Sequence, residues 1–115
     1  MIAVIFEVEP HAACKRQYLE IAASLKPALE EIDGFVSVER FQSLTNEKKL
    51  LSLSFFRDEE AIAEWRNLQA HRNAQSTGRQ TVFEKYRLRI AEVVRDYGMV
   101  DRDQAPSDSR MAHDP

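Results

Sequence analysis

Apolar and polar residues alternate along four segments of the chain, and along two others they follow the period of a helix. Alternation predicts strands, because successive side chains of a strand point to opposite faces, and it is found at residues 2–8, 35–44, 49–56 and 82–96. Apolar residues three and four positions apart predict amphipathic helices at residues 11–32 and 58–68. The resulting order is the split βαβ arrangement, a ferredoxin-like βαββαβ α+β fold with a four-stranded antiparallel sheet.

Residues that begin or end helices and strands stand at most of the predicted boundaries. Pro10 ends the first strand because it cannot donate to a ladder, and Gly34 suits the left-handed turn that stops a helix. Asp58 is a good N-cap for the second helix, whereas Pro27 removes a hydrogen bond inside the first helix and is expected to kink it. Residues 82–96 would tolerate a helix as well as a strand, and we choose a strand because the first three strands need a fourth partner.

The length of 115 residues and the mild net charge of -3 indicate one domain with no bulk attraction to nucleic acid or to an anionic membrane. Cys14 is the single cysteine, so no intrachain disulfide can form, which fits a reducing compartment. The apolar N-terminal segment lacks a basic leader and a cleavage site, and no apolar run approaches the roughly 20 residues of a membrane-spanning helix. We therefore expect a cytoplasmic protein without nucleic-acid or membrane partners.

The chain divides into a folded domain, residues 1–98, and a polar tail, residues 99–115, in which Pro, Asp, Ser and Arg dominate. The tail has too little apolar content to fold alone, so we expect it to be flexible or docked on a partner through Met99, Val100 and Met111. A sheet that is covered by helices on one side leaves its other side bare. A second copy of the chain is the usual cover, which makes a homodimer the expected assembly.

The sequence lacks the usual motifs for phosphate or metal binding. There is no glycine-rich phosphate loop, and Gly34, Gly78 and Gly98 all stand where predicted elements end. No CxxC or HExxH motif occurs, and the three histidines are scattered along the chain. We therefore expect neither a metal nor a cofactor.

Trp65 and His71 are the first candidates for a site. A single Trp on the buried stripe of a helix is usually a core residue, but its ring also suits the wall of a cavity that holds a flat substrate. His71 is either a surface residue near a helix end or a proton carrier, since imidazole titrates near neutral pH. On an unbroken helix six residues rotate by about 240°, so His71 shares the face of Trp65 only if the helix breaks near Gln69.

Further candidates lie on the strands. Phe56 at the end of the third strand and Tyr86 on the apolar side of the last strand are candidate substrate contacts, and Tyr86 can donate a hydrogen bond into a cavity. Alternation places Arg87 and Arg89 on the other side, where Glu39 is a candidate partner across the sheet. An ion pair or a dimer contact is one interpretation of Arg87, and a contact to an anionic oxygen of a substrate is another. Tyr86 and Arg87 face opposite sides of a regular strand, so at most one of them serves a cavity.

Four segments stand out together: GFVSVERFQS after the first helix, LLSLSFFRDEEAIAEW across strand and helix, AHRNAQSTGR after it, and YRLRIAEVVRDYG in the last strand. In this order they resemble the antibiotic biosynthesis monooxygenase (ABM) family of the dimeric α/β-barrel superfamily. The resemblance covers about residues 1–98.

The resemblance implies a homodimer in which two ferredoxin-like sheets pack face to face into an α/β barrel, each protomer keeping a cavity between its sheet and its helices. Oxygenases of this kind resemble cofactor-free catalysts, in which an electron-rich phenol or quinol is deprotonated, reacts directly with O₂ and becomes a quinone. The cavity tryptophan of the family corresponds to Trp65, and a polar cavity residue corresponds to His71. The leading expectation is a monooxygenase that acts on a small aromatic molecule without metal or flavin.

Two other functions stay open on the sequence. The chain also suits a non-catalytic dimeric domain that binds a small ligand or a partner protein. Haem degradation fits less well, since that branch of the family needs a histidine ligand at a position that Gln75 occupies here. That branch also uses an asparagine on the first strand, and residues 2–8 contain none.

Overall fold

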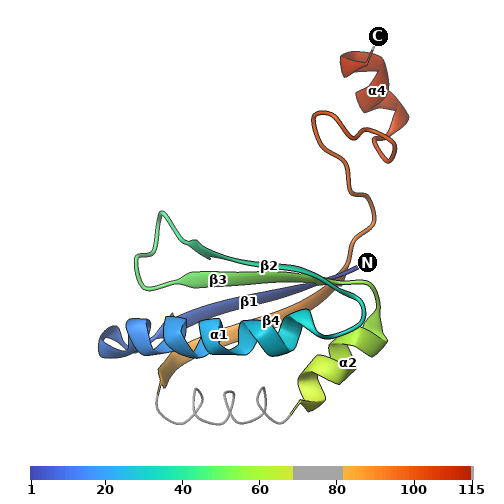
Figure 1. The fold of residues 1–115 in the computed structure, drawn as a ribbon. Coiled ribbons are helices and arrows are strands. Elements are labelled where there is room, and N and C mark those ends of the chain that lie inside the picture. Colours follow the sequence, from blue (N-terminus) through green and yellow to red (C-terminus); the bar gives the residue numbers. More distant parts are fainter. Residues whose placement is uncertain (69–81, 115) are drawn as a thin grey trace.

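The computed structural model describes residues 1–68 and 82–114. Its elements are β1 (Ile2–Pro10), the 3₁₀ turn η1 (Ala12–Cys14), α1 (Lys15–Glu30), β2 (Phe35–Gln42), β3 (Leu50–Phe56), α2 (Glu59–Asn67), β4 (Phe83–Glu92) and α4 (Ser107–His113). The strands form one antiparallel sheet in the order β2-β3-β1-β4, and α1 and α2 cover one side of it (Figure 1). The predicted ferredoxin-like fold is confirmed.

The predicted boundaries hold to within a few residues, with three differences. The helix predicted from residue 11 begins as the turn η1 and becomes regular at Lys15, and it then continues through Pro27 to Glu30. The segment predicted at residues 82–96 is a strand, as chosen, and not a helix. This strand, β4, ends earlier than predicted, at Glu92. Beyond it the chain forms a further short helix, α4, that the sequence did not predict.

The central strand β1 defines the two sides of the sheet because it pairs with both β3 and β4. Its residues Ile2, Val4, Phe6 and Val8 point to the helices. Two groups of buried residues form the core on that side. One group is Val8, Tyr18, Ala22, Leu50 and Val82, and the other is Leu29, Ile32, Phe56, Ala61 and Ile62.

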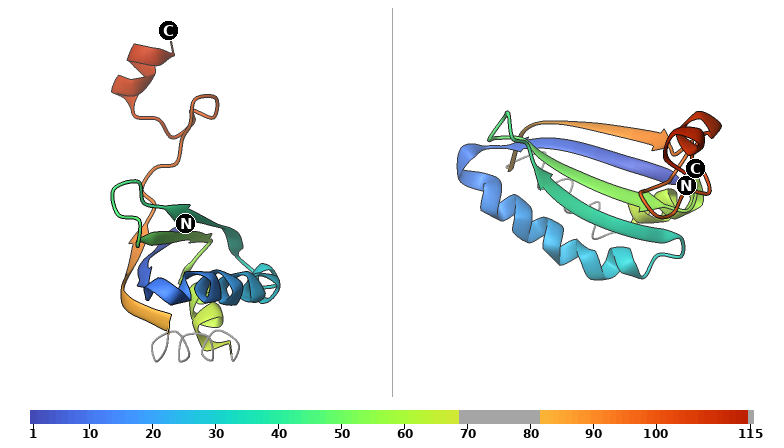
Figure 2. Two further views of the ribbon diagram at one scale, coloured as in Figure 1. Left: turned by 90° about the vertical axis from the view of Figure 1, so that its left-hand side faces the viewer. Right: turned by 90° about the horizontal axis from the view of Figure 1, so that it is seen from above.

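The other side of the sheet, which we call the open face, carries neither α1 nor α2 (Figure 2). Its centre is apolar, formed by Ala3 and Ile5 of β1 with Leu51, Leu53 and Phe55 of β3. Its two edges differ in charge. The β4 edge carries Lys85, Arg87 and Arg89, and the β2 edge carries Ser37, Glu39 and Phe41. The sheet thus has the bare apolar side that the sequence led us to expect.

α2 begins at a group of polar contacts at the end of β3. Asp58 Oδ1 accepts the backbone N–H of Ala61 at 2.9 Å, which confirms the predicted N-cap. Arg57 Nε donates to Asp58 Oδ2 at 2.8 Å, and the same guanidinium lies 3.2 Å from Asp33 Oδ1. The Arg57 hydrogen bond, followed by that of the Ala61 N–H, lowers the pKa of the Asp58 carboxyl. These contacts fix the start of the helix that carries Trp65.

Gly34 connects the end of the α1 segment to β2 and supports the same corner of the fold. Its φ of +94° lies in the left-handed region, as predicted, and its carbonyl accepts the backbone N–H of Arg57 at 2.7 Å. A Cβ at this position would lie 3.0 Å from the Cβ of Ala61 and 3.3 Å from the guanidinium of Arg57. Conformation and space therefore both require glycine here.

Replacing Gly34 tests this corner. We expect Gly34→Ala to lower the free energy of unfolding by about 1–3 kcal/mol, because alanine is strained at this φ and its methyl group meets α2. Gly98→Ala is the matched control, since a Cβ there meets nothing within 4 Å, and we expect no loss of stability. Urea denaturation of the two variants makes the comparison. Equal stability of both variants would contradict the role given to Gly34.

Candidate active site

Trp65 lies near the end of α2, on the side of that helix that faces the sheet. Together with Leu68 it packs, half-buried, against the core group that contains Phe56 and Ile62. The stripe of Ile62, Trp65 and Leu68 follows the three-residue spacing of the helix, so the helical pattern was sufficient to predict the side on which the indole lies. The indole therefore belongs to the layer between sheet and helices, where the family resemblance implies a cavity.

Phe56 is the residue of this layer that is closest to a pure core position. It is fully buried, with a relative exposure of 0%, and its ring meets the edge of Phe35 with the centroids 5.9 Å apart. Its side chain points to the helices because it pairs with Ile2 of β1. Phe56 thus forms part of the rigid wall on which Trp65 packs.

Tyr86 lies on the same side of the sheet, but in the other part of the layer. On the edge strand β4 it pairs with Val8, and its ring lies 5.7 Å from that of Phe6 and 5.8 Å from that of Phe83. Phe83 in turn contacts Tyr18 of α1 at a centroid distance of 5.8 Å. The Tyr86 ring is half-exposed, so it forms an accessible end of an aromatic row under the sheet.

Arg87 and Arg89 lie on the open face, as the alternation predicted. Arg89 Nη1 donates to Glu7 Oε2 at 2.8 Å, so the neighbouring strand supplies the partner of this arginine. Glu39, the partner that the sequence suggested, lies in the same row of paired residues as Arg89, but β3 and β1 stand between the two side chains. Tyr86 and Arg87 consequently face opposite sides of β4, and one cavity cannot use both side chains.

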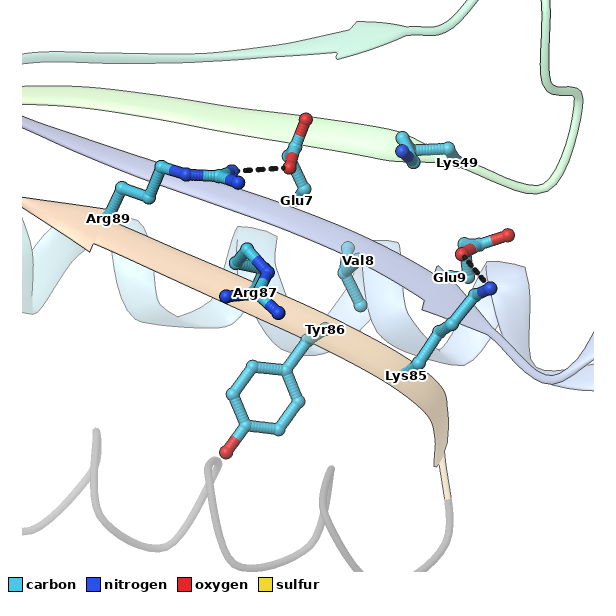
Figure 3. Close-up of a pocket in the computed structure, with 8 residues that line it drawn as sticks. All are labelled: Glu7, Val8, Glu9, Lys49, Lys85, Tyr86, Arg87 and Arg89. Carbon is cyan, nitrogen blue, oxygen red and sulfur yellow. Dashed lines mark hydrogen bonds and ion pairs between the residues drawn. The ribbon is translucent and has the colours of Figure 1, made fainter.

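The open face is hollowed at the start of β4, with a cavity volume of about 400 Å³ (Figure 3). Residues of β1 and β4, together with Lys49 just before β3, line the hollow, and most of them are charged: Glu7, Val8, Glu9, Lys49, Lys85, Tyr86, Arg87 and Arg89. Asn46 Nδ2 donates to Glu9 Oε1 at 3.1 Å, and Lys85 Nζ lies 3.2 Å from Glu9 Oε2. The Asn46 hydrogen bond and the charge of Lys85 lower the pKa of Glu9 against the opposing effect of burial. This hollow is on the side of the sheet that lies away from Trp65.

Arg40 is a polar residue of the helix side whose importance the sequence did not reveal. Among the described residues, its Nε is buried without a hydrogen-bond partner. Its guanidinium lies near Tyr18. Burial raises the pKa of the Tyr18 hydroxyl, and the charge of Arg40 opposes that increase. A buried N–H that lacks a partner costs stability, so a ligand oxygen that accepted it would be favoured. Alternation gives the side on which Arg40 points, but not that α1 covers it.

His71, the predicted proton carrier, lies outside the described residues, as do Gly78 and Gln75. Within residues 1–68 and 82–114, no group of three or more His, Cys, Asp or Glu side chains could hold a metal ion. The helices in the same part of the chain are too short or too polar to cross a membrane.

The fold and this aromatic layer define a class: a ferredoxin-like α+β domain with one side of its sheet under two helices and the other side open. A model of the antibiotic biosynthesis monooxygenase family matches residues 1–77, and the chain belongs to this family. The resemblance that the four sequence segments suggested is thereby confirmed.

Among curated proteins the chain is similar to the jasmonate monooxygenase ABM of Pyricularia oryzae, with 46% identity over 93 residues. The match covers 81% of this chain and 43% of that protein, so the chain spans less than half the length of this relative.

Solved structures show the same fold. A protein from Mycobacterium tuberculosis superposes with a TM-score of 0.75 at 14% identity, over 84% of this chain and 98% of that one. A candidate antibiotic biosynthesis monooxygenase from Deinococcus radiodurans gives a TM-score of 0.75 at 12% identity, over 85% and 97%. At such identities the likeness concerns the fold alone.

The contacts of Glu9 predict a pH dependence of stability. A carboxyl whose pKa is lowered by folding stabilises the fold at a pH above its unfolded pKa of 4.5. This contribution is lost as the pH falls through the pKa of the folded state. We expect Glu9→Gln to be less stable than the natural chain at pH 7, and the difference to shrink below pH 4.5. Glu47→Gln, an exposed neighbour of Asn46, is the control and should not change the profile. Urea midpoints between pH 7 and pH 3 provide the measurement, and a difference independent of pH would contradict it.

Proposed function

We propose that this chain is a monooxygenase that oxidises a small aromatic or quinol-like molecule with O₂ in the layer between sheet and helices. The observation that carries the proposal is Trp65, which lies half-buried in that layer on a chain whose family and curated relative are both named for monooxygenase activity. The indole offers a flat apolar surface to an aromatic ring. The reaction needs no metal, flavin or haem in this proposal.

The chemistry is balanced without an external reductant. A phenol gives up its proton to a base, the electron-rich ring carbon takes one oxygen atom of O₂, and the products are a quinone and one molecule of water. The base we propose is His71, and the surrounding apolar wall, Trp65 and Phe56, keeps out bulk water. Tyr86, from the helix side of β4, is the candidate donor to the developing oxyanion. Arg87 points to the open face and is therefore the weaker of the two polar candidates.

The relative from Pyricularia oryzae suggests a second substrate class, since its name states that it acts on jasmonate. Jasmonate is an anion, and Arg40 is a half-buried cation of the helix side whose Nε is buried without a hydrogen-bond partner among the described residues. Hydroxylation that forms an alcohol and water consumes two further electrons, so this reaction would require a reductant that quinol oxidation does not. The need for a reductant therefore separates the two substrate classes.

The assembly we propose is a homodimer, because proteins of this family are typically dimeric and the open face of this chain is apolar at its centre. The proposal that the chain is a non-catalytic dimeric binding domain remains the alternative. It predicts ligand binding without consumption of oxygen, and haem binding is a special case that a hemin titration would detect.

Oxygen uptake tests the function. We expect turnover with at least one member of a hydroquinone and phenol panel, or with jasmonate in the presence of NADPH. His71→Ala should lower kcat by roughly a hundredfold or more, as loss of a general base does. His11→Ala is the matched control, because His11 is an exposed residue at the start of η1.

The indole is tested in the same assay. Trp65→Phe keeps an aromatic wall and should retain more activity than Trp65→Leu, which keeps apolar volume without the large flat ring. Circular dichroism checks that both variants are folded. If uptake with every substrate equals the His71→Ala background, the enzyme proposal fails and the binding alternative is favoured.

A further inference from the structure

The helix side of the sheet carries a polar strip between its two apolar core groups. On that side β3 presents Leu50, Ser52, Ser54 and Phe56 in order. Leu50 belongs to one core group and Phe56 to the other, so the two serines lie between them. Ser54 is buried, although serine is mostly found at protein surfaces. We call Ser52, Ser54 and Arg40, which lies beside them on β2, the polar strip.

Arg40 is the charged member of the polar strip, and it points toward the helices. It pairs with Ser52 of β3, and Ser52 pairs with Phe6 of β1, whose side chain packs against the core on the helix side. Paired residues of an antiparallel sheet share a side, so the three side chains point the same way. The guanidinium accordingly lies near the Tyr18 hydroxyl of α1, and its Nε is buried.

Arg40 has a cationic head without an acidic partner. Within residues 1–68 and 82–114, the ion pairs all use other cations, and the buried Nε of Arg40 donates to no acceptor. Glu39, the neighbouring carboxylate on β2, points to the open face. A cation that is partly removed from water without a counter-charge or an acceptor is costly, and folded proteins ordinarily pair such groups. An anionic ligand would supply both the charge and the acceptor.

The polar strip is continuous with the layer that contains the indole. Ser54 pairs with Val4 of β1, which packs against the core group that Trp65 also contacts. Along β3, the pairing partner of Arg40 stands four residues before Phe56, which corresponds to about 13 Å at the rise of a strand. A single small molecule can therefore place an anionic group at Arg40 and an apolar ring near Trp65.

We propose that Arg40 binds a carboxylate of the substrate, and that it makes the site specific for ring compounds that carry an acid group. This inference rests on the proposed function and names the substrate class of the same site. The planar guanidinium is suited to a carboxylate, because its N–H groups match the two oxygens. The hydroxyl groups of Ser52 and Ser54 lie beside the path from Arg40 to the indole and can bond to polar substituents of the molecule. Arg40 determines specificity and takes no part in the proton transfer assigned to His71.

Tryptophan fluorescence tests the binding of acids without any need for turnover, because Trp65 is the single tryptophan of the chain. The ligands are hydroxyphenylpropionate, hydroxyphenylacetate and cyclohexylpropionate, each compared with its own methyl ester. We expect at least one acid to bind more tightly than its ester. Arg40→Gln should raise the Kd of that acid by about tenfold or more and leave the Kd of the ester unchanged. Arg16→Gln is the matched control, because the Arg16 side chain is 92% exposed on α1.

The stability of the ligand-free protein shows whether Arg40 serves the fold instead. Arg40→Met keeps an unbranched apolar stem and removes the buried N–H that lacks a partner. We expect its urea midpoint to equal or exceed that of the natural chain, because an uncompensated buried donor is lost. A lower midpoint would show that the arginine stabilises the ligand-free fold, and it would overturn the view that Arg40 is kept for a ligand.

The binding data also separate this inference from the enzyme proposal. If no acid binds more tightly than its ester, or if Arg40→Gln weakens acid and ester equally, the acid site is overturned. Oxygen uptake with a neutral phenol would then still support the oxygenase. Acid binding that depends on Arg40, in a protein that consumes no oxygen with any substrate, would have the opposite meaning: the acid site would stand, and the chain would be a binding protein.

Discussion

The structure depends on one constraint, which is that β1 carries apolar side chains on both of its faces. Val8 is buried on the helix side, where Ile2, Val4 and Phe6 pack partly buried against the core, while Ala3 and Ile5 form the apolar centre of the other side. Two antiparallel neighbours supply the hydrogen bonds of this strand, so its position in the middle of the sheet follows from its burial. Everything else is arranged around the two surfaces that this strand creates. The helices and the aromatic layer occupy one, and the open face is the other.

The elements that could be predicted are those with a strong local signal. The alternation of β1 and the three-residue spacing of Ile62, Trp65 and Leu68 gave both the type of element and the side that it buries. Asp58 marked the start of α2 because an N-cap is a local hydrogen bond between neighbours in sequence. The α4 segment gave no such signal. Its order comes from Arg102 and Arg110 bonding to residues several positions away, which no periodic pattern records.

The candidate site could be predicted only in part, for a related reason. The sides of Trp65 and Tyr86 follow from periodicity, but the burial of the Arg40 Nε depends on how α1, which carries Tyr18, packs on the sheet. Strict alternation also fails at the start of β2, where a bulge between Phe35 and Ser37 shifts the register. Phe35 therefore shares the helix side with Val38 instead of lying opposite to it. Properties that arise from packing between distant elements need the fold itself.

The two surfaces of the sheet are coupled through stability. The substrate cavity of the proposed function leaves space unfilled on the helix side, and unfilled apolar space costs roughly 24 cal/mol for each Å³. A single domain of this length has a stability margin of only about 5–15 kcal/mol. The second copy proposed for the open face binds the folded chain and not the unfolded one, so it adds stability that grows with its concentration above the dissociation constant. The strands that hold Phe56 and Tyr86 belong to both surfaces of the sheet. The free energy of dimerisation on the open face therefore offsets the cost of an unfilled cavity on the helix side. A chain that assembles as proposed can hold the substrate cavity of the proposed function, which a monomer of the same size would have to fill with side chains.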